Sequence, residues 1–273
     1  MRTRTLRSYV VVAVCAWACG SDPVSGGAQN NPPPGTPPPP PTAPSDLVLY
    51  TTLDGPSAVM SPASGSGSGI TIETLPSNDF VAARYGSGLR TNAIAERILI
   101  PQTDGQTQNV ELERGTIEFW YRPNYDHNNN LKYTIIGTGN WHGMNASSGL
   151  GSLHLGKHNL SNQNMIFLIF YDANAVRWEH NVVASAYGWR AGDWLLIRLT
   201  WDFNVAPGVQ NLHLYINGAE LPLTGEVSRG PQPIPAERSS ERMYIGARDV
   251  QGGIIADGIY DEFKVWNRVI PPS

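Results

Sequence analysis

The sequence predicts an all-β domain after residue 45, built as a sandwich of two antiparallel sheets. Short segments with alternating or continuous apolar residues recur along this region, and Gly, Pro, Asn and Asp residues separate them. No segment shows the strong 3.6-residue apolar period of an amphipathic helix. Strands without helices between them stack as layers, and sandwiches of up to about 250 residues form single domains, so we expect one domain over residues 46–273.

Residues 1–18 have the composition of an export signal. Arg2, Arg4 and Arg7 form a basic start, and the apolar segment Tyr9–Ala18 follows them. That segment is too short to cross a bilayer, which requires about 20 residues, but it is typical of a signal peptide. We therefore expect residues 1–18 to be removed during export.

The residues around Cys19 resemble a bacterial lipobox, because the small residue Ala18 precedes the cysteine. The resemblance implies cleavage before Cys19 and lipidation of its thiol. The expected location is then the bacterial cell envelope, at the outer membrane, with the lipid as the only membrane contact. The alternative is an ordinary secretory signal and a secreted protein.

Residues 19–45 are expected to form a disordered tether that begins at the lipidated cysteine. The segment is rich in proline, including the uninterrupted run Pro37–Pro41, and it has no apolar periodicity. Such a segment buries too little apolar surface to offset the entropy of ordering. Proline runs favour the extended polyproline II conformation, about 3.1 Å per residue, so the tether is expected to be semi-rigid.

Composition excludes several functions. The formal net charge is −4 and no run of Lys or Arg occurs, so we expect no nucleic-acid partner, which would require a basic surface. The chain has 2 cysteines, Cys15 and Cys19, and both precede the predicted domain. The domain therefore has no cysteine nucleophile, no cysteine-ligated zinc and no internal disulfide.

The strands are expected where the apolar pattern has period two or forms a short run. On the segment Thr116–Arg122 apolar and polar residues alternate, so successive side chains face opposite sides of a sheet. Asn217-Gly218 is a strong signal for a tight turn. The expected strands are Leu47–Leu53, Arg97–Ile100, Thr116–Arg122, Lys132–Gly137, Ser152–Leu155, Met165–Tyr171, Val176–His180, Trp194–Trp201, Leu212–Asn217, Met243–Gly246 and Ile259–Trp266.

Motifs in several of these strands follow one another in a recognisable order. They are Gly115–Pro123, Trp194–Asp202, Leu212–Gly218, Met243–Gly246 and Tyr260–Arg268. Together they resemble the laminin-G-like members of the concanavalin A-like lectin/glucanase superfamily. The resemblance implies a jelly roll of two curved antiparallel sheets, with a glycan or calcium site along the concave face or the loop rim.

The aromatic and acidic residues of these motifs are expected to be chiefly structural. Trp120, Trp201 and Trp266 lie on predicted strands, where packing stabilises the fold by a few kcal/mol. Asp261 and Glu262 are expected to accept hydrogen bonds from backbone N–H groups, because buried polar groups need partners.

The sequence predicts that the domain is not an enzyme. Glucanases of the superfamily use an acid-x-acid-x-acid strand, which places two carboxylates beside one glycosidic bond. Glu111-Leu112-Glu113 is the nearest match, and the third acid is missing. A lyase would instead use Tyr, His and Arg side chains. His154, Tyr171 and Arg177 are the available set, and spacing alone does not say whether they meet.

Two polar, aromatic segments are the expected ligand-binding loops. Sugar recognition combines an aromatic platform with planar polar groups on a rigid scaffold. Residues 124–130 and 139–145 have that composition, and Trp141 is the best platform unless it folds back over the sandwich edge. The expected ligand-binding residues are Tyr125, Asp126, His127, Trp141, His142 and Asp249.

Calcium binding is left open by the sequence. The ion needs six to eight oxygen ligands, and loop or strand-end carboxylates would have to supply them. The available acids are Asp126, Asp172, Asp202 and Asp249, without EF-hand spacing.

The function that the sequence predicts is a non-catalytic, carbohydrate-binding or adhesive lipoprotein exposed at the cell envelope. Its expected partner is a polysaccharide or glycoconjugate. One alternative is a protein-interaction or scaffold module on the same sandwich, which would bind envelope or extracellular proteins. The other is a polysaccharide lyase or glycoside hydrolase, against which the missing acid triplet argues.

Overall fold

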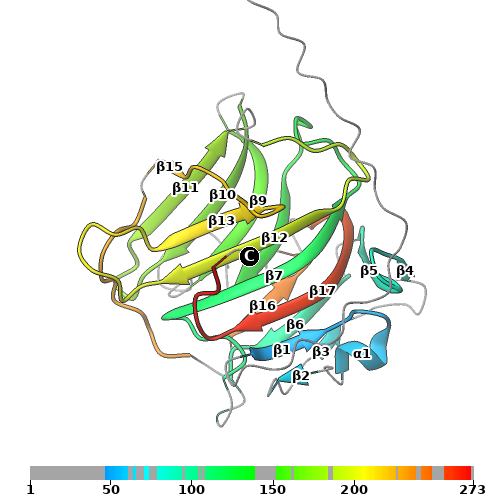
Figure 1. Ribbon diagram of the computed structural model, residues 1–273, viewed down its shortest axis with the longest axis horizontal. Helices are drawn as coiled ribbons and strands as arrows, with labels where there is room; N and C mark the ends of the chain where they lie inside the picture. The colour runs from blue at the N-terminus through cyan, green and yellow to red at the C-terminus, as the bar shows by residue number, and fades with distance from the viewer. Residues whose placement is uncertain are drawn as a thin grey trace, which may run out of the picture. The chain divides into compact units, whose positions relative to one another are not determined.

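The computed structural model shows a β-sandwich, and the predicted fold class is confirmed (Figure 1). The described residues are 47–60, 64–65, 71–73, 79–93, 96–103, 105, 108–138, 152–160, 163–183, 187–225, 227–237, 241–247 and 255–271. The expected signal peptide, Cys19 and the tether lie outside them. One short helix, α1 (Pro56–Met60), accompanies the strands. No helix in the described part of the chain is long and apolar enough to cross a membrane.

The first sheet contains the motif strands from both ends of the domain, and we call it the β7 sheet. Its order is β14-β13-β12-β7-β17-β1-β2, with β5 paired to β17 and β4 paired to β5. The strands are β1 (Leu47–Thr51), β2 (Ser64–Gly65), β4 (Phe80–Ala82), β5 (Ser87–Thr91), β7 (Arg114–Pro123), β12 (Leu195–Asp202), β13 (Leu212–Ile216), β14 (Ala219–Glu220) and β17 (Gly258–Trp266).

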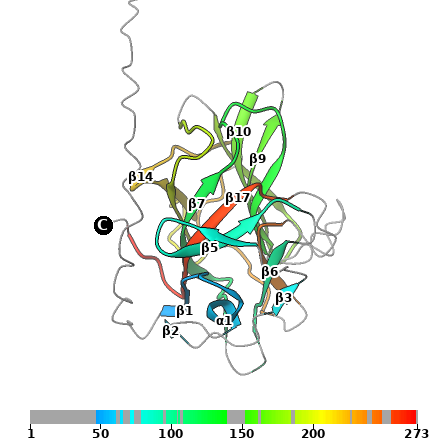
Figure 2. The same cartoon turned by 90° about the vertical axis from the view of Figure 1, so that its right-hand side faces the viewer.

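The second sheet has the order β15-β11-β10-β9-β8-β16-β6-β3, and we call it the β10 sheet. All pairings in both sheets are antiparallel. The strands are β3 (Thr71–Glu73), β6 (Arg97–Pro101), β8 (Tyr133–Thr138), β9 (Leu153–Leu160), β10 (Gln163–Tyr171), β11 (Arg177–Val183), β15 (Thr224–Gly225) and β16 (Arg242–Ile245). Figure 2 shows the layers from the side, with β1 and β2 in one and β3 and β6 in the other.

Every strand expected from the sequence overlaps an observed strand. The strands that were not expected are short, and β2 and β15 contain only two residues each. A strand of two residues is too short to show an alternating pattern. It forms because a neighbouring strand offers hydrogen-bonding groups to its backbone.

The inner faces of the two sheets share one hydrophobic core. On β7, Ile117, Phe119 and Tyr121 are 0% exposed, as the alternation predicts. They join one buried cluster with inward side chains of the β10 sheet, such as Leu155 and Leu168. Burying a large apolar side chain contributes about 1.5–3 kcal/mol, so this layer supplies most of the driving force for folding.

Trp201 explains why a glycine is the second residue of β7. The indole is buried, and its Nε1–H donates a 3.1 Å hydrogen bond to the Glu111 carbonyl. Trp201 pairs with Gly115 across the sheet, where a Cβ atom would lie 2.4 Å from the ring. Trp266 is also buried, so the structural role expected for these two tryptophans is confirmed.

A row of polar side chains crosses the outer face of the β7 sheet at Glu118. Glu118 is directly opposite Arg198 on β12 and Lys264 on β17. Its carboxylate accepts hydrogen bonds from the Arg198 guanidinium, with Nε at 2.7 Å, and lies 3.7 Å from Lys264 Nζ. All three side chains are largely buried, so the acid neutralises two cations at the centre of the sheet.

Replacement of Glu118 by glutamine is expected to destabilise the domain by about 2–4 kcal/mol. The change keeps the side-chain size but leaves Arg198 and Lys264 without their counter-charge in a poorly solvated place. Urea unfolding at neutral pH measures the change.

The matched control is Glu220→Gln, which removes the exposed ion pair with His213 and should cost less than about 1 kcal/mol. Equal effects of the two substitutions would contradict a central role for Glu118.

Candidate functional site

The structure places Tyr125 in the core and not on a binding loop. The side chain is 4% exposed, and its ring stacks on Tyr133 with a centroid distance of 3.6 Å. Trp189 packs edge-on against it and donates an Nε1–H hydrogen bond to the Tyr125 carbonyl. Tyr125, one of the expected ligand-binding residues, therefore has no ring face left for a ligand, because the chain turns inward after Pro123.

Asp126 and His127 connect their loop to residues 187–191. Asp126 is exposed, and its Oδ1 accepts a 2.8 Å hydrogen bond from the backbone N–H of Ala191. His127 is half-buried, and its Nδ1 lies 2.9 Å from the Trp189 carbonyl oxygen. Both side chains thus hold two segments together. Trp141, His142 and Asp249 lie outside the described residues.

Lys157 is a buried cation beneath the same loop. It is 0% exposed, and its ammonium group donates hydrogen bonds to the carbonyl oxygens of Asn129 and Leu131. Burial lowers the pKa of Lys157 to about 8. The loop that the sequence marked for binding is therefore anchored from inside the sandwich.

Two of the four acids considered for calcium bond to the backbone of their own turns. Asp172 accepts hydrogen bonds from the backbone N–H groups of Asn174 and Val176, and Asp202 accepts one from Asn204. Such bonds close turns of the Asx type. Within the described ranges, no three His, Cys, Asp or Glu side chains are grouped so that they would hold a metal ion.

The residues considered for lyase chemistry do lie on one face of the β10 sheet. Tyr171 is directly opposite Arg177, and His154 pairs with Ile169, two residues before Tyr171. His154 is 2% exposed, and the Arg177 guanidinium forms an ion pair with Glu179. The topology brings the set together, but one member is buried and the charge of another is neutralised.

A different group of aromatic and cationic side chains occupies the outer face of the β7 sheet. Trp120 and Arg122 alternate outward along β7, and both are half-buried. Arg84 lies 4.8 Å from the Trp120 ring centroid, and Tyr85 meets that ring edge-on at 6.5 Å. Arg122 lies 5.9 Å from the ring of Trp194. We call these five residues the Trp120 face.

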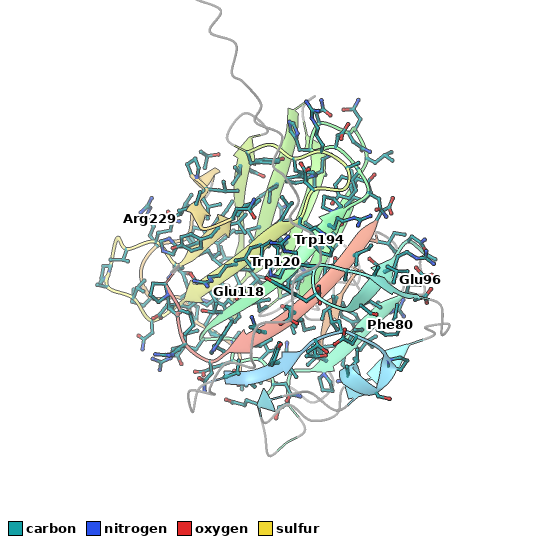
Figure 3. All side chains as sticks on the ribbon, turned by 45° about the vertical axis from the view of Figure 1, so that its right-hand side comes forward. Phe80, Glu96, Glu118, Trp120, Trp194 and Arg229 are labelled. Carbon is teal, nitrogen blue, oxygen red and sulfur yellow. The ribbon has the colours of Figure 1, made fainter. Side chains whose placement is uncertain are left out.

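The Trp120 face draws its side chains from separate segments of the chain. Trp194 is the residue immediately before β12. Because the next residue, Leu195, pairs with Tyr121, Trp194 lies across from Arg122. Arg84 and Tyr85 come from the turn between β4 and β5. Figure 3 shows Trp194, Trp120 and Glu118 in a row along the sheet, with Trp120 in the middle. The result is two indole rings with guanidinium groups against them.

Buried acids on β17 hold the turn that carries Arg84 and Tyr85. Asp261 is 0% exposed, and its Oδ2 accepts a 2.7 Å hydrogen bond from the Tyr85 backbone N–H. The expected role of Asp261 as a backbone acceptor is confirmed. Glu262 instead accepts a 2.5 Å hydrogen bond from the Tyr50 hydroxyl. Burial raises the pKa of Asp261 to about 8.

Part of the Trp120 face was detectable in the sequence. The alternation along Thr116–Arg122 already placed Trp120 and Arg122 on the polar side of their strand. It was interpreted as packing, since a strand tryptophan is usually buried. Arg84 and Tyr85 carry no local signal, and Trp194 begins a predicted strand whose neighbour only the sheet register reveals.

Comparisons with known proteins agree with this architecture. A family model described as "Concanavalin A-like lectin/glucanases superfamily" matches residues 96–273. No curated protein matches the sequence.

Solved structures show the same fold at low sequence identity. Domain 4 of AbnA, an extracellular GH43 arabinanase from Geobacillus stearothermophilus, has a TM-score of 0.53 and 13% identity, and the match covers 83% of this chain and 95% of that domain. The binding domain of botulinum neurotoxin serotype D has a TM-score of 0.53 and 13% identity, over 84% of this chain and 49% of that one. The match thus spans about half of that binding-domain chain.

Replacement of Asp261 by asparagine is expected to reduce the pH dependence of stability. Its pKa is raised from 3.8 to about 8, so the folded protein keeps a proton that the unfolded chain releases between these pH values. Stability therefore falls as pH rises through this interval, by at most about 1.4 kcal/mol per pH unit. Asparagine does not titrate but still accepts the Tyr85 hydrogen bond.

Urea unfolding of both proteins between pH 4 and pH 8 measures the difference in slope. Asp126→Asn is the matched control, because Asp126 also accepts a backbone hydrogen bond but is exposed. An unchanged slope in the Asp261 variant would contradict the assignment.

Proposed function

This chain belongs to the concanavalin A-like lectin/glucanase superfamily, and from that premise we propose that it is a non-catalytic carbohydrate-binding protein. The proposed binding surface is the Trp120 face. The observation that supports it most directly is the half-buried pair Trp120 and Trp194, with Arg84 and Arg122 against their rings. Trp, Tyr and Arg are the side chains that contribute most often to the energy of binding surfaces.

The chemistry of these side chains fits a sugar polymer. An indole face stacks on the apolar C–H face of a sugar ring, and it loses little conformational entropy when it does so. A guanidinium group offers several N–H donors in one plane, which match adjacent hydroxyl oxygens. One ring on β7 and one immediately before β12 provide stacking positions for successive sugars.

The structural relatives support a carbohydrate as the ligand class. The arabinanase domain was solved in complex with arabinotriose, and it is a separate domain of an extracellular enzyme. The missing acid triplet at Glu111–Glu113 and the neutralised Arg177 support binding without catalysis.

A protein ligand is the second candidate function. One relative, the binding domain of botulinum neurotoxin DC, was solved in complex with rat synaptotagmin II, with a TM-score of 0.51 and 15% identity. The match covers 83% of this chain and 49% of that chain. Aromatic residues and arginine are also the side chains that dominate protein–protein interfaces.

Replacement of Trp120 or Trp194 by alanine is expected to weaken glycan binding at least about tenfold. Each change removes one stacking surface, and a central aromatic contact typically contributes about 2 kcal/mol or more. A glycan array identifies the ligand, and titration calorimetry then measures the affinity of each variant.

Leu131→Ala is the matched control, because it removes an apolar side chain that is 62% exposed but does not belong to the Trp120 face. It should leave glycan binding unchanged. The Trp141→Ala variant tests the alternative loop site. Loss of binding in that variant alone would move the site to residues 139–145, and a silent array would contradict glycan binding altogether.

We also propose that residues 1–18 direct export, that Cys19 is lipidated, and that residues 19–45 tether the domain of residues 46–273 to the cell envelope. The motif around Cys19 and the proline run support this arrangement. Attachment through acyl chains would compensate for a net charge of −4, which disfavours contact with anionic lipids.

Replacement of Cys19 by serine is expected to release the protein from the membrane fraction, because the acyl chains have no other attachment point. Cell fractionation followed by immunoblotting measures the distribution. The Cys15→Ser variant is the control, and it should remain in the membrane fraction. Identical fractionation of all three proteins would contradict lipidation at Cys19.

A further inference from the structure

Arg122 has no acidic partner among the residues that the structure describes, whereas three other arginines of the sandwich do. Arg198 pairs with Glu118, Arg177 with Glu179 and Arg114 with Glu111. Arg122 forms no hydrogen bond or ion pair with any residue that the structure describes, and its recorded contact is the Trp194 ring.

The strands beside Arg122 bring no free carboxylate to it. Across the sheet, Trp194 lies on one side of Arg122 and Ile259 of β17 lies on the other. Arg90 of β5 is the residue opposite Ile259 on its far side. In the adjacent row Trp120 is opposite Asp261, whose carboxyl is buried and bonded to the Tyr85 N–H. The burial of Asp261 raises its pKa, which keeps much of it uncharged at neutral pH.

The acids at the end of β7 already have partners. Asp257 Oδ1 accepts a 2.8 Å hydrogen bond from the Asn124 side chain. Asp193 Oδ2 accepts a 2.7 Å hydrogen bond from the Arg190 backbone N–H. The five residues of the Trp120 face include two arginines and no acid, although the whole chain has a net charge of −4.

A guanidinium group in this setting is suited to a carboxylate. Its planar fork matches the two carboxylate oxygens, and ionised hydrogen bonds are about twice as strong as neutral ones. The adjacent Trp194 ring excludes water from one side, which strengthens the attraction. We propose that the Trp120 face selects an acidic polysaccharide whose sugar rings stack on Trp120 and Trp194 and whose carboxylate pairs with Arg122.

This inference rests on the proposed function, and the test separates the two. The probes are polygalacturonate, alginate and hyaluronate, each compared with its own carboxyl-reduced form, so that only the charge differs. Titration calorimetry of the purified protein should show at least about tenfold tighter binding of an acidic probe than of its reduced form. Added salt should reduce this difference.

Arg122→Gln should abolish the preference, and Arg122→Lys should retain part of it, since lysine keeps the charge without the fork. Arg229→Gln is the matched control, because it removes an equal charge from an exposed position away from the Trp120 face (Figure 3). It should leave the preference intact.

Equal binding of acidic and reduced probes that depends on Trp120 would overturn the inference and leave carbohydrate binding in place. No binding of any probe, together with a silent glycan array, would overturn both. A loss of affinity in Arg229→Gln equal to that in Arg122→Gln would show general attraction to polyanions and contradict a role for Arg122. Binding of dextran sulfate through Arg122, without binding of any carboxylate probe, would contradict the carboxylate assignment.

Discussion

The alternation of side chains along β7 is the constraint on which the rest of the structure depends. Ile117, Phe119 and Tyr121 enter the core that joins the two sheets. The residues between them face outward, where Glu118 neutralises the cations of both neighbouring strands and Trp120 begins the proposed binding face. A shift of one residue in register would exchange these two sets, so the same hydrogen-bond ladder determines both stability and the position of the site.

The closing strand β17 connects this ladder to the turn that completes the face. It pairs with β7, β1 and β5, and its register shifts between Asp261 and Lys264. Glu262 has a positive φ of 54° there, an uncommon conformation for a residue with a side chain, which marks the bulge. The bulge lets Asp261 hold the turn at Tyr85 while Lys264 reaches Glu118. The positions on either side of the bulge thus support different parts of the outer face.

The proposed site lies on a sheet face, whereas the sequence pointed to loops. The loop at residues 124–130 proved to be anchored by Tyr125, His127 and Lys157, which contact the interior or a neighbouring segment. A sheet face is more rigid than a loop, so aromatic rings placed on it lose less entropy on binding. Membership of the superfamily establishes the fold, and the residues of the Trp120 face are the physical basis of the carbohydrate binding that we propose.

The sequence by itself determined the fold class, the position of the longer strands and the alternation that puts Trp120 and Arg122 on one side of β7. These properties are local, because period-two patterning is visible within a single strand. Only the tertiary structure decided which strands are neighbours, and therefore that Arg84, Tyr85 and Trp194 complete the face while Tyr125 is buried. The reason is that strand pairing joins segments far apart in the chain, and the resulting contacts leave no periodic trace in either segment.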